Sequence, residues 1–165
     1  MALSGGNNLP DELLVIWGAG PVTPSSTTPD YISLKDVDAV EVVIIGLNGT
    51  TVTGSAVTLL QATAVAGTSE KALAFSNYYA TADAGATDTL VKTTASSNTF
   101  TTTTTNSKAF VYRIPVDPKT LDSANGFDCL RAGVANAANT TITVAYLIRP
   151  KYAGPANNHP TVITD

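Results

Sequence analysis

Residues 108–152 read KAFVYRIPVDPKTLDSANGFDCLRAGVANAANTTITVAYLIRPKY, and this stretch decides the fold class. It holds three strand-like runs, Ala109–Val116, Phe127–Val134 and Thr140–Ile148. The first and last alternate apolar with other residues, as strands with one buried face do. Pro150 ends the last run because proline has no N–H to donate to a sheet. The stretch therefore predicts strands separated by turns, with little helix.

The upstream sequence continues this pattern of short strands. Ala39–Leu47 has apolar residues on both alternating faces, which is typical of an interior strand. Asn48-Gly49 follows and predicts a tight hairpin, because both central positions of a type I′ turn need positive φ. Tyr78–Asp88 predicts an exposed loop. About eight to ten short strands, spaced by 8–12 residues, indicate an all-β chain that forms a β-sandwich, jelly roll or barrel, of which we expect a β-sandwich or jelly roll.

The two ends of the chain predict flexible arms, residues 1–30 and 153–165, around a domain of residues 31–152. Glycine, asparagine, proline, serine and threonine dominate much of the first arm and cannot form a packed core alone. Within this arm, periodicity leaves Leu13–Trp17 open between a short helix and a buried strand. From the residues alone, this apolar run is expected to pack on the domain or on a neighbouring subunit, and we expect a folded domain after removal of residues 1–30. The candidate contact residues are Leu9, Leu13, Leu14, Val15, Ile16 and Trp17.

Composition excludes several classes of partner. The net charge is −4, and the nine basic residues are scattered, which argues against nucleic acid. No apolar run approaches the 18 or more residues of a membrane span. Lone Cys129 excludes an internal disulfide, fits assembly in a reducing cytosol, and is expected to be a small buried hydrophobe.

The sequence contains no residue constellation that predicts catalysis. The only histidine, His159, precedes Pro160 in the C-terminal arm, where a general base would lack a fixed position. Asp36, Asp38 and Glu41 form the densest acidic group, but calcium needs six to eight oxygens, so a solvated strand end is favoured. We therefore expect no enzyme, no cofactor and no metal site.

Several segments resemble a family of small tailed-bacteriophage virion proteins encoded in head-gene modules, of the capsid decoration or cement type. The most distinctive are ANGFDCLR at residues 124–131 and YLIRPKY at residues 146–152. The others are Val57–Ala62, Gly67–Ala74, Ser97–Phe100, Asn106–Tyr112 and Leu121-Asp122. Together they span roughly residues 40–152 and leave both arms unmatched.

The resemblance implies a structural role on a phage head. It implies many copies on an icosahedral shell, bound to the major capsid protein and assembled in the host cytoplasm, and we expect a homotrimer. We expect residues 9–17 and the C-terminal arm to make the capsid or intersubunit contacts, so that the chain without residues 1–30 no longer binds heads. It implies no catalytic residues. One alternative is another virion protein, from a tail, neck or fibre. A second is a carbohydrate-binding β-sandwich module, for which the candidate aromatic residues are Trp17, Tyr31, Tyr78 and Tyr79.

Overall fold

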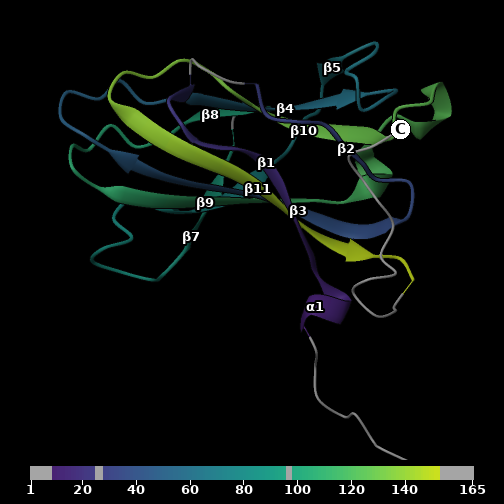
Figure 1. Ribbon diagram of the computed structural model, residues 1–165, viewed down its shortest axis with the longest axis horizontal. Coiled ribbons are helices and arrows are strands. Elements are labelled where there is room, and N and C mark those ends of the chain that lie inside the picture. The colour runs from purple at the N-terminus through teal and green to yellow at the C-terminus, as the bar shows by residue number, and fades with distance from the viewer. Residues whose placement is uncertain (1–8, 25–27, 96–97, 153–165) are drawn as a thin grey trace, which may run out of the picture.

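The computed structural model describes residues 9–24, 28–95 and 98–152, the side chain of Asp11 excepted. Two antiparallel sheets pack against each other as a sandwich, so the predicted all-β fold is confirmed (Figure 1). One sheet has six strands, in the spatial order β1 (Leu14–Val22), β11 (Thr140–Pro150), β3 (Val37–Asn48), β9 (Ala109–Val116), β6 (Asn77–Thr81) and β7 (Val91–Thr94). The other sheet has the order β2 (Ile32–Ser33), β10 (Cys129–Val134), β4 (Ala56–Ala62) and β5 (Lys71–Ala72), and β8 (Thr99–Thr101) also pairs with β4.

Helical structure in the described residues is confined to single turns. α1 (Leu9–Glu12) precedes β1 and projects from the sandwich, while 3₁₀ turns occupy Pro118–Thr120 and Ser123–Asn125. Asp117 caps the first of these turns by accepting a hydrogen bond from the Lys119 N–H, and Pro118 follows the cap, where its lack of an N–H costs nothing. Gly126 has a φ of 81° and ends the second of these turns.

The core lies between the two sheets. Alternate residues of β3, β9 and β11 point inward, and these buried side chains include Val42, Ile44, Ile114 and Val144. Ile32, Val57, Leu59 and Leu130 meet them from the second sheet. Cys129 is buried beside Tyr31 and Ala62, which confirms its expected place in the interior.

The N-terminal segment belongs to the six-stranded sheet. Residues 14–22 form β1, which pairs with β11 from Leu14↔Ile148 to Val22↔Ile142, and Ala19 is buried in the core. The structure thus places this part of the predicted arm inside the domain and resolves the choice between helix and strand. Removing residues 1–30 would remove β1 and leave β11 paired with β3 alone, which argues against the expected independent folding of residues 31–152. Residues 1–8 and 153–165 lie outside the described part of the chain.

Two local predictions are wrong. The hairpin expected at Asn48-Gly49 does not form, because β3 and β4 lie in different sheets and neither residue has a positive φ. Asn48 is instead buried, and its side-chain amide donates to the carbonyls of Thr103 and Thr105 at 2.8 and 3.0 Å. The loop expected at Tyr78–Asp88 begins with strand β6, which pairs with β9 and β7.

Candidate interaction surface

The outer surface of the six-stranded sheet carries an apolar patch. The strand registers align its side chains in rows: Trp17, Ala145 and Val43 lie opposite one another in the first row. A second row contains Val15, Leu147, Glu41 and Pro115. We define the apolar face as Val15, Trp17, Val43, Ile45, Leu47, Pro115, Ala145 and Leu147.

The largest members of the apolar face are open to solvent. The exposed fractions are 64% for Val15, 56% for Trp17, 50% for Ile45 and 57% for Leu47. Single exposed hydrophobic residues are ordinary on protein surfaces, whereas contiguous exposed apolar patches mark interaction sites. The alignment of these residues across neighbouring strands makes them a patch.

A groove deepens one end of the apolar face. It has a volume of about 340 Å³, and its apolar lining includes Leu13, Pro115 and Leu147. Its charged lining residues are Glu41, Arg113 and Arg149. Glu41 pairs with Arg113, and Arg149 pairs with Asp38 outside the groove, where its Nε donates to Asp38 Oδ2 at 2.9 Å. The groove is thus apolar within and carries both signs of charge at its edge, which suits an apolar side chain of another protein.

The predicted contact residues fall into two sets in the structure. Leu14 and Ile16 are half-buried and pack against the core, because they occupy the inward positions of β1. Leu9, Leu13, Val15 and Trp17 are exposed. The alternation of β1 therefore selects the outward residues as those available for contacts, and the groove joins Leu13 to the apolar face.

Sequence reasoning missed the contribution of β3. Both faces of Ala39–Leu47 are apolar, so the sequence predicts an interior strand in which Ile45 and Leu47 are covered. The strand does lie in the middle of its sheet, between β11 and β9, yet the described chain covers only its inner face. A signal was present in the printed sequence, since a strand with two apolar faces requires two layers of cover.

The aromatic residues proposed for sugar binding do not gather at one place. Tyr31 is buried, and burial together with its hydrogen bond to Glu70 raises the pKa of its hydroxyl. Tyr78 stacks on Phe100 with ring centroids 4.1 Å apart, on the core side of β6. Tyr79 lies opposite Arg113 on the outward side, and Trp17 lies on the edge strand β1. No shared aromatic platform forms among these four described residues.

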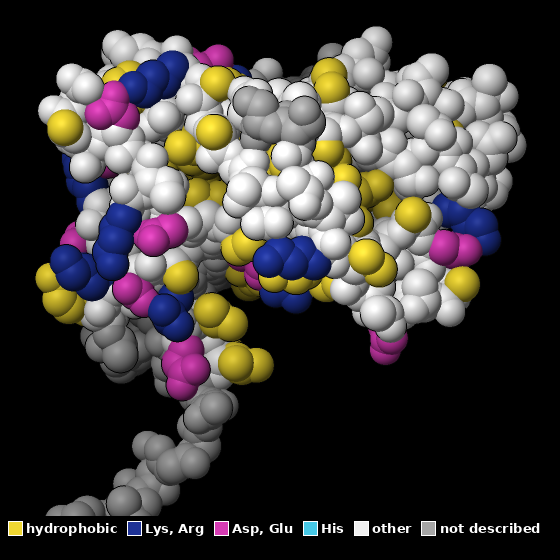
Figure 2. Space-filling model, turned by 180° about the vertical axis from the view of Figure 1, so that it is seen from behind, with side chains coloured by type: hydrophobic (Ala, Val, Ile, Leu, Met, Phe, Trp, Pro, Cys, Tyr) yellow, Lys and Arg dark blue, Asp and Glu magenta, His cyan; other side chains and the backbone are white. Residues whose placement is uncertain are grey.

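A second hollow opens between the two sheets, lined by residues of β4, β6 and the end of β9. Figure 2 shows that the face seen there is hollowed, with hydrophobic side chains at the hollow. Its volume is about 370 Å³, and Leu59, Phe75 and Val116 form much of its apolar wall. Polar groups at its rim include Ser76, Asn77, Asp117 and Thr120. Pockets of this size and polarity accept small ligands or single side chains.

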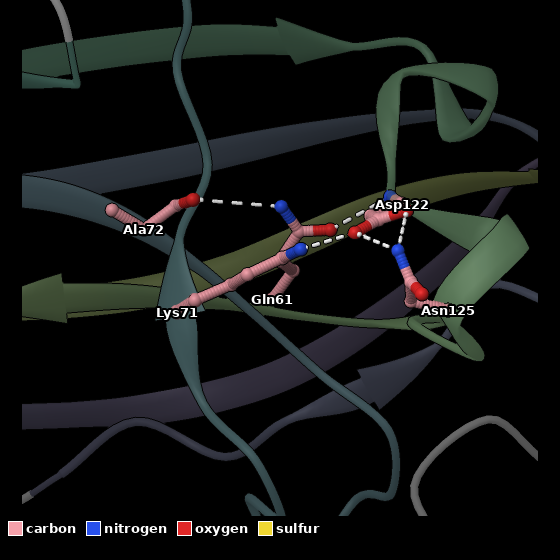
Figure 3. A network of polar contacts seen from close by, with 5 residues as sticks. All are labelled: Gln61, Lys71, Ala72, Asp122 and Asn125. Atoms are coloured by element: carbon pink, nitrogen blue, oxygen red, sulfur yellow. Dashed lines mark hydrogen bonds and ion pairs between the residues drawn. The ribbon is translucent and has the colours of Figure 1, made fainter.

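A polar network connects the turn at residues 122–125 to the second sheet (Figure 3). Lys71 forms an ion pair with Asp122, and the amide of Asn125 donates to both carboxylate oxygens at 2.9 Å. Gln61 joins the strands to this turn, because its Oε1 accepts from the Asp122 N–H at 2.9 Å. The hydrogen bonds from Lys71 and Asn125 lower the pKa of the Asp122 carboxyl. The partners are all from the chain itself, so the network explains the local conformation of this segment.

The acidic residues considered for calcium are engaged separately. Asp38 pairs with Arg149 and Glu41 pairs with Arg113. Among residues 9–24, 28–95 and 98–152, no three His, Cys, Asp or Glu side chains converge as metal ligands. His159 lies outside these ranges. In the same described part of the chain, no helix has the length and hydropathy needed to cross a membrane.

Comparison with family models, curated proteins and solved structures finds no match for this chain.

Proposed function

We propose that the chain is a virion structural protein that decorates a bacteriophage head, with its apolar face bound to the shell of major capsid protein. The single observation that carries a binding role is the uncovered outer face of β3, where Ile45 and Leu47 are exposed beside Val43. The assignment to a phage head rests on the resemblance of the segments that include ANGFDCLR and YLIRPKY. The cell compartment of assembly and the location on the capsid surface follow from the same resemblance.

The physical logic of such a role fits a surface without reacting groups. A decoration protein stabilises a shell by adding buried interface between capsid subunits, and a shell repeats each modest contact many times. An apolar patch with a polar rim is the usual composition of a stable protein interface. The groove beside Leu13 would receive an apolar side chain of the capsid protein, and Arg113 and Arg149 would border it.

The decisive experiment measures binding of the purified chain to heads prepared without it. We expect saturation at hundreds of copies per head, detected by cosedimentation and gel densitometry. The double variant Ile45→Lys/Leu47→Lys should bind at least about tenfold more weakly, because it buries two charges in an apolar interface. Both residues are exposed, so the fold should be unchanged by circular dichroism.

Val91→Lys supplies a matched control for this variant. Val91 is 63% exposed, as open as Ile45 and Leu47, but it lies opposite Ala80 of β6. Ala80 packs against the core, and residues directly opposite each other share a face of the sheet. Val91 therefore lies on the core-facing side of the sheet and not on the apolar face. Val91→Lys should bind heads normally. A handful of copies per particle would instead favour the tail, neck or fibre assignment, and unchanged binding by the double variant would refute the role of the apolar face.

A further inference from the structure

The edge of β1 is unusual among the sheet edges that the structure describes. Natural edge strands are short, charged or interrupted, because the unpaired N–H and C=O groups of an open edge can pair with another chain. β2 and β5 have two residues each, β8 has three, and β7 has four, including Lys92. β1 has nine residues, and no charged residue occurs from Leu14 to Val22. β1 is therefore the one long and uncharged edge in the described part of the chain.

The register identifies the backbone groups at this edge. The Asn48 N–H donates to the carbonyl of Lys108, which directly precedes β9, so Asn48 directs its backbone groups at β9. Successive residues of an antiparallel strand direct their N–H and C=O groups alternately at the two neighbouring strands. Following the pairing from β3 through β11 to β1, Leu14 and Ile16 direct their N–H and C=O groups at β11. Val15 and Trp17 direct theirs to the open side of β1.

A neighbouring segment limits the length of this open edge. A bulge follows Trp17, and the Gly18 carbonyl accepts a hydrogen bond from the Asp30 N–H at 3.0 Å. The edge is therefore occupied at Gly18, and among the described residues its open part runs from Leu14 to Trp17. Val15 and Trp17 are symmetrically placed about Ile16 within it.

We propose that β1 pairs antiparallel with β1 of a second copy, about a two-fold axis at Ile16. In this register the Val15 backbone of each copy bonds the Trp17 backbone of the other. Their side chains lie on the same face, and a β-branched residue opposite an aromatic one is a favourable cross-strand pair. If one strand shifted by one residue along the other, outward side chains would lie opposite inward ones. The alternation of β1 therefore allows this register, or registers that differ from it by two residues.

A second copy suits this edge because the strand is complementary to itself. Two-fold contacts require one patch to match the same patch on its partner, and β1 supplies both members of each pair. The absence of charge from Leu14 to Val22 lets two chains of net charge −4 approach at this point. Pairing would also join two apolar faces into one, because Val15 and Trp17 belong to both features. The inference does not depend on the proposed phage function, and its two-fold dimer differs from the homotrimer expected in the sequence analysis.

The first test is the mass of the full chain in solution, measured by light scattering over a concentration series. We expect a dimer of twice 16.9 kDa at high concentration, and a blue shift in the emission of Trp17, the single tryptophan, on association. Val15→Pro removes an N–H that faces the open edge while keeping the β11 pairing, so the variant should fold and dimerise at least about tenfold more weakly. Val15→Lys tests the same edge if proline disturbs folding. Leu47→Lys, on the apolar face but away from the edge, should dimerise normally.

A cysteine pair tests the register. At the two-fold axis, Ile16→Cys would place two thiols on residues whose Cα atoms are about 4.5 Å apart, within disulfide range. Val15→Cys lies opposite Trp17 of the other copy and should cross-link more slowly. Native Cys129 is buried and should stay reduced. A monomer at all concentrations, a trimer, or dimerisation unaffected by Val15→Pro and Val15→Lys would overturn the proposal, and faster cross-linking through Val15→Cys would overturn its register.

Discussion

Tyr146 ties the two sheets together through its hydroxyl, and Tyr146→Phe tests what this tie contributes. The side chain is fully buried between the sheets. Its hydroxyl accepts a hydrogen bond from the Ala132 N–H of β10 at 3.1 Å and donates one to the Asp30 carbonyl at 2.9 Å. The variant keeps the ring and its packing, so it removes these two bonds and little else.

The expected loss follows from what each partner can do afterwards. The Ala132 N–H is fully buried with no access to water, and a buried donor without a partner costs about 1–3 kcal/mol. Asp30 is exposed, so water can reach its carbonyl in part, and we assign it about 1 kcal/mol. The free energy of unfolding should therefore fall by about 2–4 kcal/mol. At the size of this chain, each kcal/mol corresponds to a change in Tm of roughly 2–4 °C.

Urea unfolding followed by circular dichroism measures this loss. The midpoint should move to lower urea while the slope of free energy against urea stays constant, because the exposed area does not change. Tyr152→Phe is the matched control, since Tyr152 is exposed and should leave stability unchanged. If Tyr146→Phe were as stable as Tyr152→Phe, the hydroxyl would contribute nothing and the hydrogen bonds would be no link between the sheets.

Three further predictions concern the same fold. The lowered pKa of Asp122 means that its carboxylate stabilises the fold above the unfolded pKa of about 3.9, and that this effect is lost as pH falls through the lower folded value. Asp122→Asn should therefore make the free energy of unfolding less dependent on pH in the acid range. The raised pKa of Tyr31 gives the opposite dependence of stability on pH: its contribution to the free energy of unfolding is complete below the unfolded pKa of about 10 and is lost as pH rises further. Tyr31→Phe should reduce that alkaline loss in urea titrations. Gly46→Ala should destabilise the chain by about 1–3 kcal/mol in the same assay, because an added Cβ would lie 2.2 Å from Cζ of Phe110; a Tm equal to that of the unmodified chain would contradict this.

The strands with one apolar face could be predicted from the sequence, but their neighbours could not. The alternation of Ala109–Val116 and Thr140–Ile148 corresponds closely to β9 and β11. Periodicity identifies which residues share a face, and it carries no information about which strands pair. Asn48-Gly49 illustrates this limit: the dipeptide fits a hairpin locally, whereas buried hydrogen bonds from Asn48 to distant threonine carbonyls determine its conformation.

The candidate surface was predicted only in its N-terminal part, for a related reason. Leu13–Trp17 was singled out as an unassigned apolar run, and its outward residues do lie on the exposed surface. The sequence did not separate these residues from Leu14 and Ile16, because the choice between helix and strand was open. Ile45 and Leu47 were missed because a two-faced apolar strand predicts cover on both sides without saying which molecule provides it.

The stability of this chain does not explain why Ile45 and Leu47 are hydrophobic. Half or more of each side chain remains exposed in the folded chain, so little of the free energy of burial is gained within the sandwich. Threonine would pair in the strand equally well and would remove an exposed apolar surface that promotes association. Their register neighbours Thr143 and Thr141 on β11 are threonines, which demonstrates that this face accepts polar residues. This exposure supports our proposal that the two side chains contact another protein, and the open edge of β1 lies at the end of the same face.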